Sequence, residues 1–238
     1  MGGTIQLGEV VLDVTHKDIK NVHLSVYPPD GTVRVSAPRH MSLDTIRVFV
    51  ISKLGWIKRE QRKLREQERE TPREFLDRES HYVWGQRYLL EIVECAAGPR
   101  VQLKHRALVL QVRPGSDRPK KKEVLARWYR DQIRSALPEL TARWEPRLGV
   151  EVERVYVQRM KTKWGGCTPA TRTIRLNTEL AKKPRECLEY ILVHEMVHLV
   201  EPTHNEQFQQ LMDSVMPMWR ERRAELNRAP LAHEDWGY

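Results

Sequence analysis

Four residues in one short segment have the types and spacing of a mononuclear zinc hydrolase site. His194, Glu195 and His198 form an HExxH motif, and His204 follows shortly after it. Two histidines four positions apart lie on the same face of a helix, one turn from each other, so both imidazoles can reach one metal ion. Glu195 points about 100° further round the helix. It is therefore the candidate base that takes a proton from a water at the metal.

His204 cannot belong to the same helix as His198. Six further residues at about 1.5 Å rise would carry it roughly 9 Å along the axis, too far to share a metal. Pro202 predicts that the chain turns, since a proline disfavours helix at the preceding residue and removes a backbone donor.

A second helix is expected directly after this turn. Thr203 and Glu206 have the spacing of a capping box, which places His204 in the first turn of the new helix, folded back toward the metal. We therefore expect His194, His198 and His204 to bind one Zn²⁺ per chain.

The surroundings of the motif favour a catalytic site. The segment from Leu188 to Val200 is mostly apolar, so its helix should be largely buried. Burying two histidines and a glutamate is costly without a strong partner, which weighs against a pair of hydrogen-bonded core histidines. Three protein ligands also leave the fourth zinc position open, whereas a structural zinc site is closed by four.

The composition is that of a soluble protein with room for one large or two small domains in its 238 residues. No apolar stretch approaches about 18 residues, and the first ten residues lack the basic region of a signal peptide. We expect a cytoplasmic protein with no membrane segment. Cys95, Cys167 and Cys187 are scattered, which argues against a disulfide framework.

A basic segment at residues 100–134 carries most of the net charge of +9. Eleven cations stand there against the three acids Asp117, Glu123 and Asp131. Such a cluster can bind a nucleic acid, a nucleotide or an acidic protein. The alternative is a solvated helix face with a basic linker, because no aromatic nucleic-acid motif accompanies the charge. The cations are Arg100, Lys104, Arg106, Arg113, Arg118, Lys120, Lys121, Lys122, Arg127, Arg130 and Arg134.

The first half of the chain is predicted to be β-rich with one long helix. Alternating segments at 4–14, 22–27 and 32–37 predict strands, the last two joined as a hairpin. Ser42 is the expected N-cap of a helix that runs on into residues 58–70. Further short strands are expected within 82–93, 101–103 and 107–112. The turn at residues 114–117 then predicts a domain boundary after Gly115.

The second half, residues 116–238, is predicted to hold the metal site. Apolar spacing predicts helices at 121–137 and 140–148 and strands at 152–157 and 173–177, with a tight turn at 163–167. The HExxH helix should extend from Pro184 to about Val200, and Pro217 should kink or split the helix opened by Thr203. The tail from Ala229 should be loose.

Several segments together resemble the YgjP-like metallopeptidases, which are related to SprT-type zinc metalloproteases. They are KWGGC at 163–167, TIRLN at 173–177 and HEMVHLVEPTHNEQF at 194–208, with DGTVRVSAP at 30–38 and Trp56-Ile57 fitting as well. The resemblance implies an α+β fold, in which residues 1–115 form a β-rich domain and 116–238 a zincin-like domain. It implies the same three histidine ligands and Glu195 as base. The family commonly has Ser where Gly166 stands, a departure that touches no expected ligand.

The mechanism that these features predict is hydrolysis of a peptide bond. Zinc would activate a water and polarise the scissile carbonyl, while Glu195 would pass the water proton to the leaving amine. Tyr190, Arg159 and Lys163 are candidate donors to the developing oxyanion. The strand at 173–177 is a candidate edge for pairing with an extended peptide or protein substrate.

Two other functions use the same residues. A zinc hydrolase with a basic segment could instead be a nucleotide pyrophosphatase, although the chain has no Gly-rich phosphate loop and the site has no carboxylate ligand of the kind that recruits magnesium. A DNA-associated protease or a zinc-containing binding module is the third hypothesis. A purely structural zinc is disfavoured, because the site lacks a fourth protein ligand.

Overall fold

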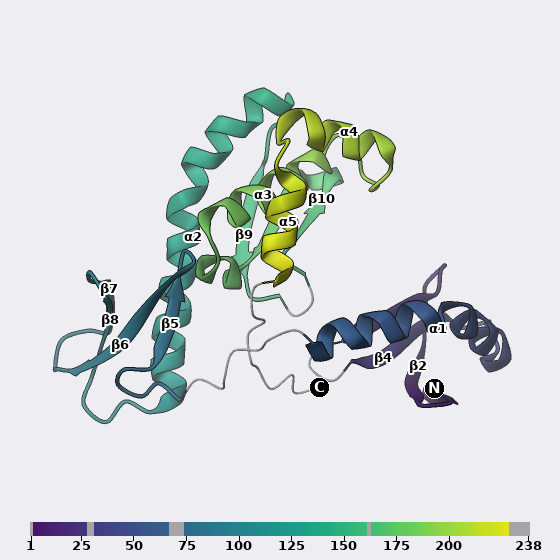
Figure 1. Cartoon of the computed structure of the whole chain (residues 1–238), viewed down its shortest axis with the longest axis horizontal. Coiled ribbons are helices and arrows are strands. Elements are labelled where there is room, and N and C mark those ends of the chain that lie inside the picture. Colours follow the sequence, from purple (N-terminus) through teal and green to yellow (C-terminus); the bar gives the residue numbers. More distant parts are fainter. Residues whose placement is uncertain (1, 28–30, 67–73, 161–162, 229–238) are drawn as a thin grey trace. The chain divides into compact units, whose positions relative to one another are not determined.

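The structure, a computed structural model, describes residues 2–27, 31–66, 74–160 and 163–228 (Figure 1). The tail that the sequence predicts to be loose, residues 229–238, lies outside these ranges. The described chain divides into two compact units, one on each side of residues 67–73. Both contain helices and strands, which confirms the α+β class.

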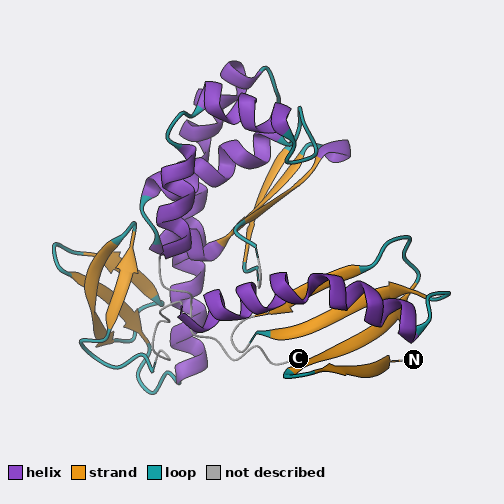
Figure 2. Ribbon diagram, turned by 45° about the vertical axis from the view of Figure 1, so that its right-hand side comes forward, coloured by secondary structure: helices purple, strands orange, loops and turns teal. Residues whose placement is uncertain are grey.

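The first unit is a four-stranded sheet with one long helix. The strands are ordered β1-β2-β4-β3, with β2 parallel to β4 and both outer pairs antiparallel. Figure 2 shows the helix lying along the sheet. The elements are β1 Gly2–Leu7, β2 Val10–Lys17, β3 His23–Tyr27, β4 Thr32–Pro38 and α1 Leu43–Glu66.

Helix α1 begins where the sequence predicts. The Ser42 hydroxyl accepts a hydrogen bond from the Thr45 N–H at 3.2 Å, as an N-cap does. Ile46, Val50 and Ile57 of α1 are fully buried in the core of this unit, together with alternate residues of the strands. The predicted hairpin at 22–37 is confirmed as the antiparallel pair β3 and β4.

The second unit starts with the same topology. Its first sheet has the order β5-β6-β8-β7, again with a parallel inner pair and antiparallel outer pairs, and again followed by a helix. The sequence alone gave no sign of this repeated arrangement. The elements are β5 Ser80–Val83, β6 Gln86–Glu94, β7 Arg100–Leu103, β8 Ala107–Val112 and α2 Arg118–Leu148.

Helix α2 is continuous over 31 residues, which corrects the prediction of two helices at 121–137 and 140–148. Pro138 lies inside it and removes one backbone donor. The Thr141 hydroxyl donates to the Leu137 carbonyl at 2.9 Å, and Leu137 and Trp144 stay buried on one face. The packing of that face maintains the helix across the proline.

A three-stranded sheet and three helices complete the unit. The strand order is β10-β11-β9, with β11 antiparallel to β10 and parallel to β9. The elements are β9 Arg154–Gln158, β10 Gly165–Thr168, the 3₁₀ turn η1 Pro169–Thr171, β11 Thr173–Asn177, the 3₁₀ turn η2 Thr178–Lys182, α3 Arg185–Val197, α4 Glu206–Val215 and α5 Trp219–Arg228.

Two local predictions need correction here, and a third is confirmed. Residues 165–168 form strand β10, where the sequence predicted a tight turn, because they pair with β11. Helix α3 ends at Val197, earlier than the predicted Val200. The split expected at Pro217 is confirmed, since α4 ends at Val215 and α5 begins at Trp219.

The predicted domain boundary after Gly115 does not match the division into units. The sheet β5–β8 shares one continuous core with α2, α3 and the second sheet. Backbone bonds also join the turn after β5 to η2, from Trp84 N–H to the Ala181 carbonyl at 2.8 Å. The Tyr129 hydroxyl on α2 donates to the Tyr82 carbonyl at 2.9 Å. A cut after Gly115 would pass through this core.

No described helix is both long enough and apolar enough to cross a membrane. The three cysteines are free thiols, with Cys187 buried and the other two partly exposed.

The shared core predicts how fragments behave. A fragment of residues 72–229 keeps the unit whole, whereas one of residues 116–238 exposes the buried side chains of Leu125, Tyr129 and Ile133. We expect the first to unfold in one cooperative thermal transition and the second to show none, as measured by circular dichroism. Equal transitions in both fragments would contradict a core shared across residue 115.

Candidate metal centre

Three histidine side chains converge on one point beside α3. The Nε2 atom of His204 lies 3.0 Å from Nε2 of His198 and 3.0 Å from Nε2 of His194. Tetrahedral zinc with bonds of about 2.0–2.1 Å would separate its ligand nitrogens by roughly 3.3–3.4 Å. Among the described residues, these three form the cluster of metal-binding side chains. Their arrangement fits a divalent ion with little adjustment.

The turn after α3 fixes how His198 presents its ring. Nδ1 of His198 lies 3.0 Å from the Glu201 carbonyl, which can only accept. The proton is therefore on Nδ1, and the lone pair of Nε2 faces the other histidines. The Glu201 carboxylate in turn accepts from the Thr203 N–H at 3.1 Å and hydroxyl at 2.8 Å. These bonds hold the turn around Pro202 that returns the chain toward α3.

The cap of α4 is one correction to this segment. Asn205, and not Thr203, is the N-cap, and its side-chain oxygen accepts from the Phe208 N–H at 2.9 Å. His204 therefore lies in the turn before α4 instead of in its first turn. The Thr203 hydroxyl is already hydrogen-bonded to the Glu201 carboxylate. Asn205 is the next residue whose side chain is able to cap the helix.

Phe208 packs against all three histidines. Its ring centroid lies 4.9, 4.7 and 4.8 Å from those of His194, His198 and His204, and Phe208 is 2% exposed. Nothing in the sequence indicates this contact, because the helical spacing of Phe208 is that of any core residue. The ring restricts the orientation of each imidazole.

Glu195 is buried against strand β10. It is 6% exposed. A Cβ atom added to Gly165 would lie 2.6 Å from the Glu195 carboxylate and 2.8 Å from the Ile191 side chain. Any side chain at residue 165 would therefore collide with both. The absence of a side chain at Gly165 lets β10 approach α3 and confines the Glu195 carboxylate.

Burial shifts the acid–base properties of the site. It lowers the pKa of His194 to about 3, with the positive charges of His198, His204 and Arg223 acting in the same direction. Burial raises the pKa of Glu195 to about 7, opposed by the charge of Lys163. His194 is thus neutral at physiological pH, the form that binds a metal.

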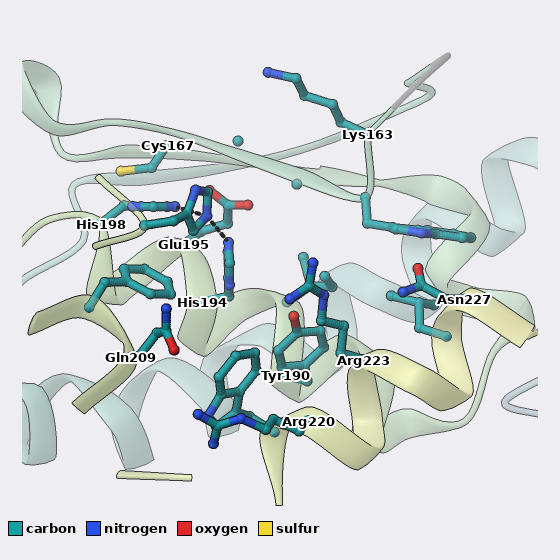
Figure 3. A pocket seen from close by; sticks show the side chains of 18 of the residues that line it. Lys163, Cys167, Tyr190, His194, Glu195, His198, Gln209, Arg220, Arg223 and Asn227 are labelled. Atoms are coloured by element: carbon teal, nitrogen blue, oxygen red, sulfur yellow. Dashed lines mark hydrogen bonds between the residues drawn. The ribbon is translucent and has the colours of Figure 1, made fainter. Parts of the chain in front are cut away.

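The histidines lie at one end of a cleft of about 1060 Å³. Figure 3 shows His198 and Cys167 at one end and Asn227 of α5 at the other, with Tyr190 and Arg223 between them. Of the three candidate oxyanion donors, Tyr190 and Lys163 line the cleft and Arg159 does not. No residue of the basic segment 100–134 lines it either.

Strand β10 forms the free edge along this cleft. Gly165, Gly166 and Cys167 line the cleft, and within the described ranges the strand pairs on one side only, with β11. The prediction that residues 173–177 form the edge is wrong, since β11 is the central strand.

Asn177 is a residue whose position the sequence did not predict. Its side-chain amide donates to the carbonyls of Met160 at 2.9 Å and Lys163 at 2.8 Å. It thereby holds Met160 and Lys163, which precede β10.

Comparison with known proteins finds one family and several structures. A family model described as "YgjP-like, metallopeptidase domain" matches residues 20–229. No curated protein sequence matches the chain. The chain is similar to the metallopeptidase zymogen of Pyrococcus abyssi abylysin, with 23% identity over 40% of this chain and 98% of that one and a TM-score of 0.35. For the zymogen of Methanocaldococcus jannaschii jannalysin the values are 21%, 37%, 85% and 0.34.

The contact between Gly165 and Glu195 predicts a difference between two neighbouring glycines. Gly165→Ala should destabilise the fold by about 1–3 kcal/mol, because the added methyl overlaps two buried side chains. Gly166→Ala is the matched control, since its nearest neighbour would be Met160 at 4.0 Å, and it should change stability by less than about 0.5–1 kcal/mol. Denaturant unfolding measures both, and equal effects would show that the contact is not tight.

Proposed function

Since the chain belongs to the YgjP-like metallopeptidase family, we propose that it is a zinc-dependent peptidase whose centre is His194, Glu195, His198 and His204. The observation that carries this proposal is the convergence of the three histidines beside a buried glutamate: Nε2 of His204 lies 3.0 Å from Nε2 of both His194 and His198. Such a set provides three imidazole nitrogens for a metal and one candidate base, the groups that metal-assisted hydrolysis uses to activate a water.

His194, His198 and His204 would hold the zinc ion. Imidazole nitrogen is a donor that zinc prefers, and three protein ligands leave a position for water or substrate. When bound, the metal supplies Lewis acidity, which polarises the scissile carbonyl and makes a water more acidic. Phe208 and the Glu201 carbonyl keep the imidazoles aligned for this task.

Glu195 would accept the proton of the attacking water and deliver it to the leaving amine. Its carboxylate is confined by Gly165 and Ile191, which limits the number of orientations it can adopt. Tyr190 and Lys163 are the two donors along the cleft that could stabilise the oxyanion of the substrate.

An extended peptide would bind along β10. The free edge of this strand lies over the cleft, and main-chain hydrogen bonds to it would place a peptide bond above the histidines. A Cβ atom at Gly166 would meet only Met160, at 4.0 Å, so this position of β10 leaves room beside the strand. This arrangement favours a peptide or protein substrate.

The alternative of nucleotide hydrolysis has little support from the site. The basic segment lies away from the cleft lining, and part of its charge is already paired, as Lys120 and Arg127 both contact Glu123 at 2.8 and 2.9 Å. The nucleic-acid hypothesis likewise rests on charge alone and stays a prediction. Family membership favours the peptidase over both.

Metal content provides the first test. The purified protein should carry about one zinc ion per chain, and His194→Ala should lose most of it while an exposed histidine elsewhere, changed in His105→Ala, should not. Elemental analysis of the three proteins gives the answer. The same zinc content in His194→Ala as in wild type would remove His194 from the ligands.

Glu195→Gln separates chemistry from binding. The amide is nearly isosteric but cannot accept the proton, so hydrolysis should fall by about 10²–10⁴-fold while zinc content and melting temperature stay close to wild type. Zinc-loaded wild type and variant are assayed against casein and against nucleoside triphosphates. Cleavage of triphosphates but not casein by the wild type would favour the alternative, and loss of zinc in the variant would make Glu195 a ligand.

A further inference from the structure

Arg223 has an exposed side chain on the part of α5 that lines the cleft. Residues three or four apart share one face of a helix, and Arg223 follows Trp219 by four positions and precedes Leu226 by three. Trp219 and Leu226 are 5% and 2% exposed. Arg222 has a similar spacing, but of the two arginines only Arg223 lines the cleft. The Arg223 side chain is therefore accessible to a molecule bound there.

The charge of Arg223 is not neutralised by any residue in the described ranges. Its neighbours on α5 are paired, Arg220 with Asp213 and Arg222 with Glu225 at 3.3 Å. No hydrogen bond or ion pair is formed by Arg223 within the same part of the chain. Its guanidinium keeps all its donors available for a ligand.

Arg223 lies in the same part of the cleft as Tyr190. Both residues line the cleft, and the charge of Arg223 acts on Tyr190 and on His194 (Figure 3). Tyr190 precedes His194 by one helical turn, with the two ring centroids 5.9 Å apart. Among the described residues that line the cleft, the carboxylate is that of Glu195, which is buried against Gly165. This part of the cleft thus offers a positive charge with no anion beside it.

We propose that Arg223 binds a carboxylate of the peptide and is thereby a specificity-determining residue of the proposed peptidase. A guanidinium donates two parallel hydrogen bonds to a carboxylate, which gives both affinity and orientation. One helical turn is about 5.4 Å and an extended peptide advances about 3.3 Å per residue. The carboxylate therefore belongs to a residue within about two positions of the scissile bond.

Two kinds of carboxylate can reach this place, and paired peptides distinguish them. One is the side chain of Asp or Glu, tested by peptides that differ only by Glu or Gln at each of the two positions on either side of the scissile bond. The other is the α-carboxylate of a peptide that ends there, tested by the free acid against the C-terminal amide. In either case the wild type should cleave the carboxylate member with a kcat/KM higher by about 10–100-fold.

Arg223→Gln should abolish this preference while leaving the cleavage of the neutral peptides within a few-fold of wild type. Arg222→Gln, which removes the same charge one residue earlier on α5, is the matched control and should retain the preference. Arg223→Glu should prefer a Lys peptide to its Glu counterpart. Zinc content is measured in every variant, since a change of charge near the histidines can alter metal binding.

Two results would overturn the proposal: a preference that survives in Arg223→Gln, or an equal loss of kcat/KM on all peptides, which would assign Arg223 to the reaction itself. Binding provides a readout that does not depend on turnover. Calorimetry of the paired peptides with Glu195→Gln, with and without Arg223→Gln, should show tighter binding of the carboxylate peptide only where Arg223 is present.

This binding experiment separates the two proposals. If the zinc-loaded wild type cleaves no peptide but the carboxylate preference in binding depends on Arg223, the proposed peptidase function fails and the carboxylate site stands. If peptides are cleaved and binding shows no such preference, the carboxylate site fails and the function stands.

Discussion

The convergence of three imidazole nitrogens on one point is the constraint on which the rest of this site depends. A neutral imidazole has one N–H group, and His198 uses its own on the Glu201 carbonyl. Its Nε2 lone pair therefore faces His204, 3.0 Å away. A proton on one ring would reduce the repulsion between these closely spaced lone pairs. Burial prevents His194 from taking up that proton, because it lowers the pKa of His194 to about 3. A set of nitrogen lone pairs arranged in this way is suited to bind a divalent cation.

The second constraint is the closeness of α3 to β10. A buried carboxylate is costly, and a strand placed against it must provide either a partner or space. Here Gly165 provides space, so that Glu195 and Ile191 fit directly under the strand. The same contact fixes the candidate base and brings the free edge of β10 over the histidines. Catalysis and substrate binding would thus depend on the same contact between a helix and a strand.

The sequence was sufficient for the parts of the site that are set by short-range spacing. The separation of His194 and His198 and the turn at Pro202 were enough to predict the three-histidine cluster, which the geometry brings together. Strand β10 was missed because a Gly-rich segment reads as a turn until its partner β11 is known. Thr203 and Asn205 are both residue types that cap helices, and the capping-box spacing favoured Thr203, whose hydroxyl is bonded instead to the Glu201 carboxylate.

Long-range pairing explains the larger differences between prediction and structure. The orders β1-β2-β4-β3 and β5-β6-β8-β7 are the same, yet no similarity of residues revealed it. What distinguishes the two arrangements is the helix that follows, 24 residues in α1 and 31 in α2. The end of α2 reaches α3, where the Trp144 Nε1 donates to the Glu189 carboxylate at 2.8 Å. Because α2 supports both its own sheet and the helix that carries His194, the sheet β5–β8 is part of the unit that holds the site.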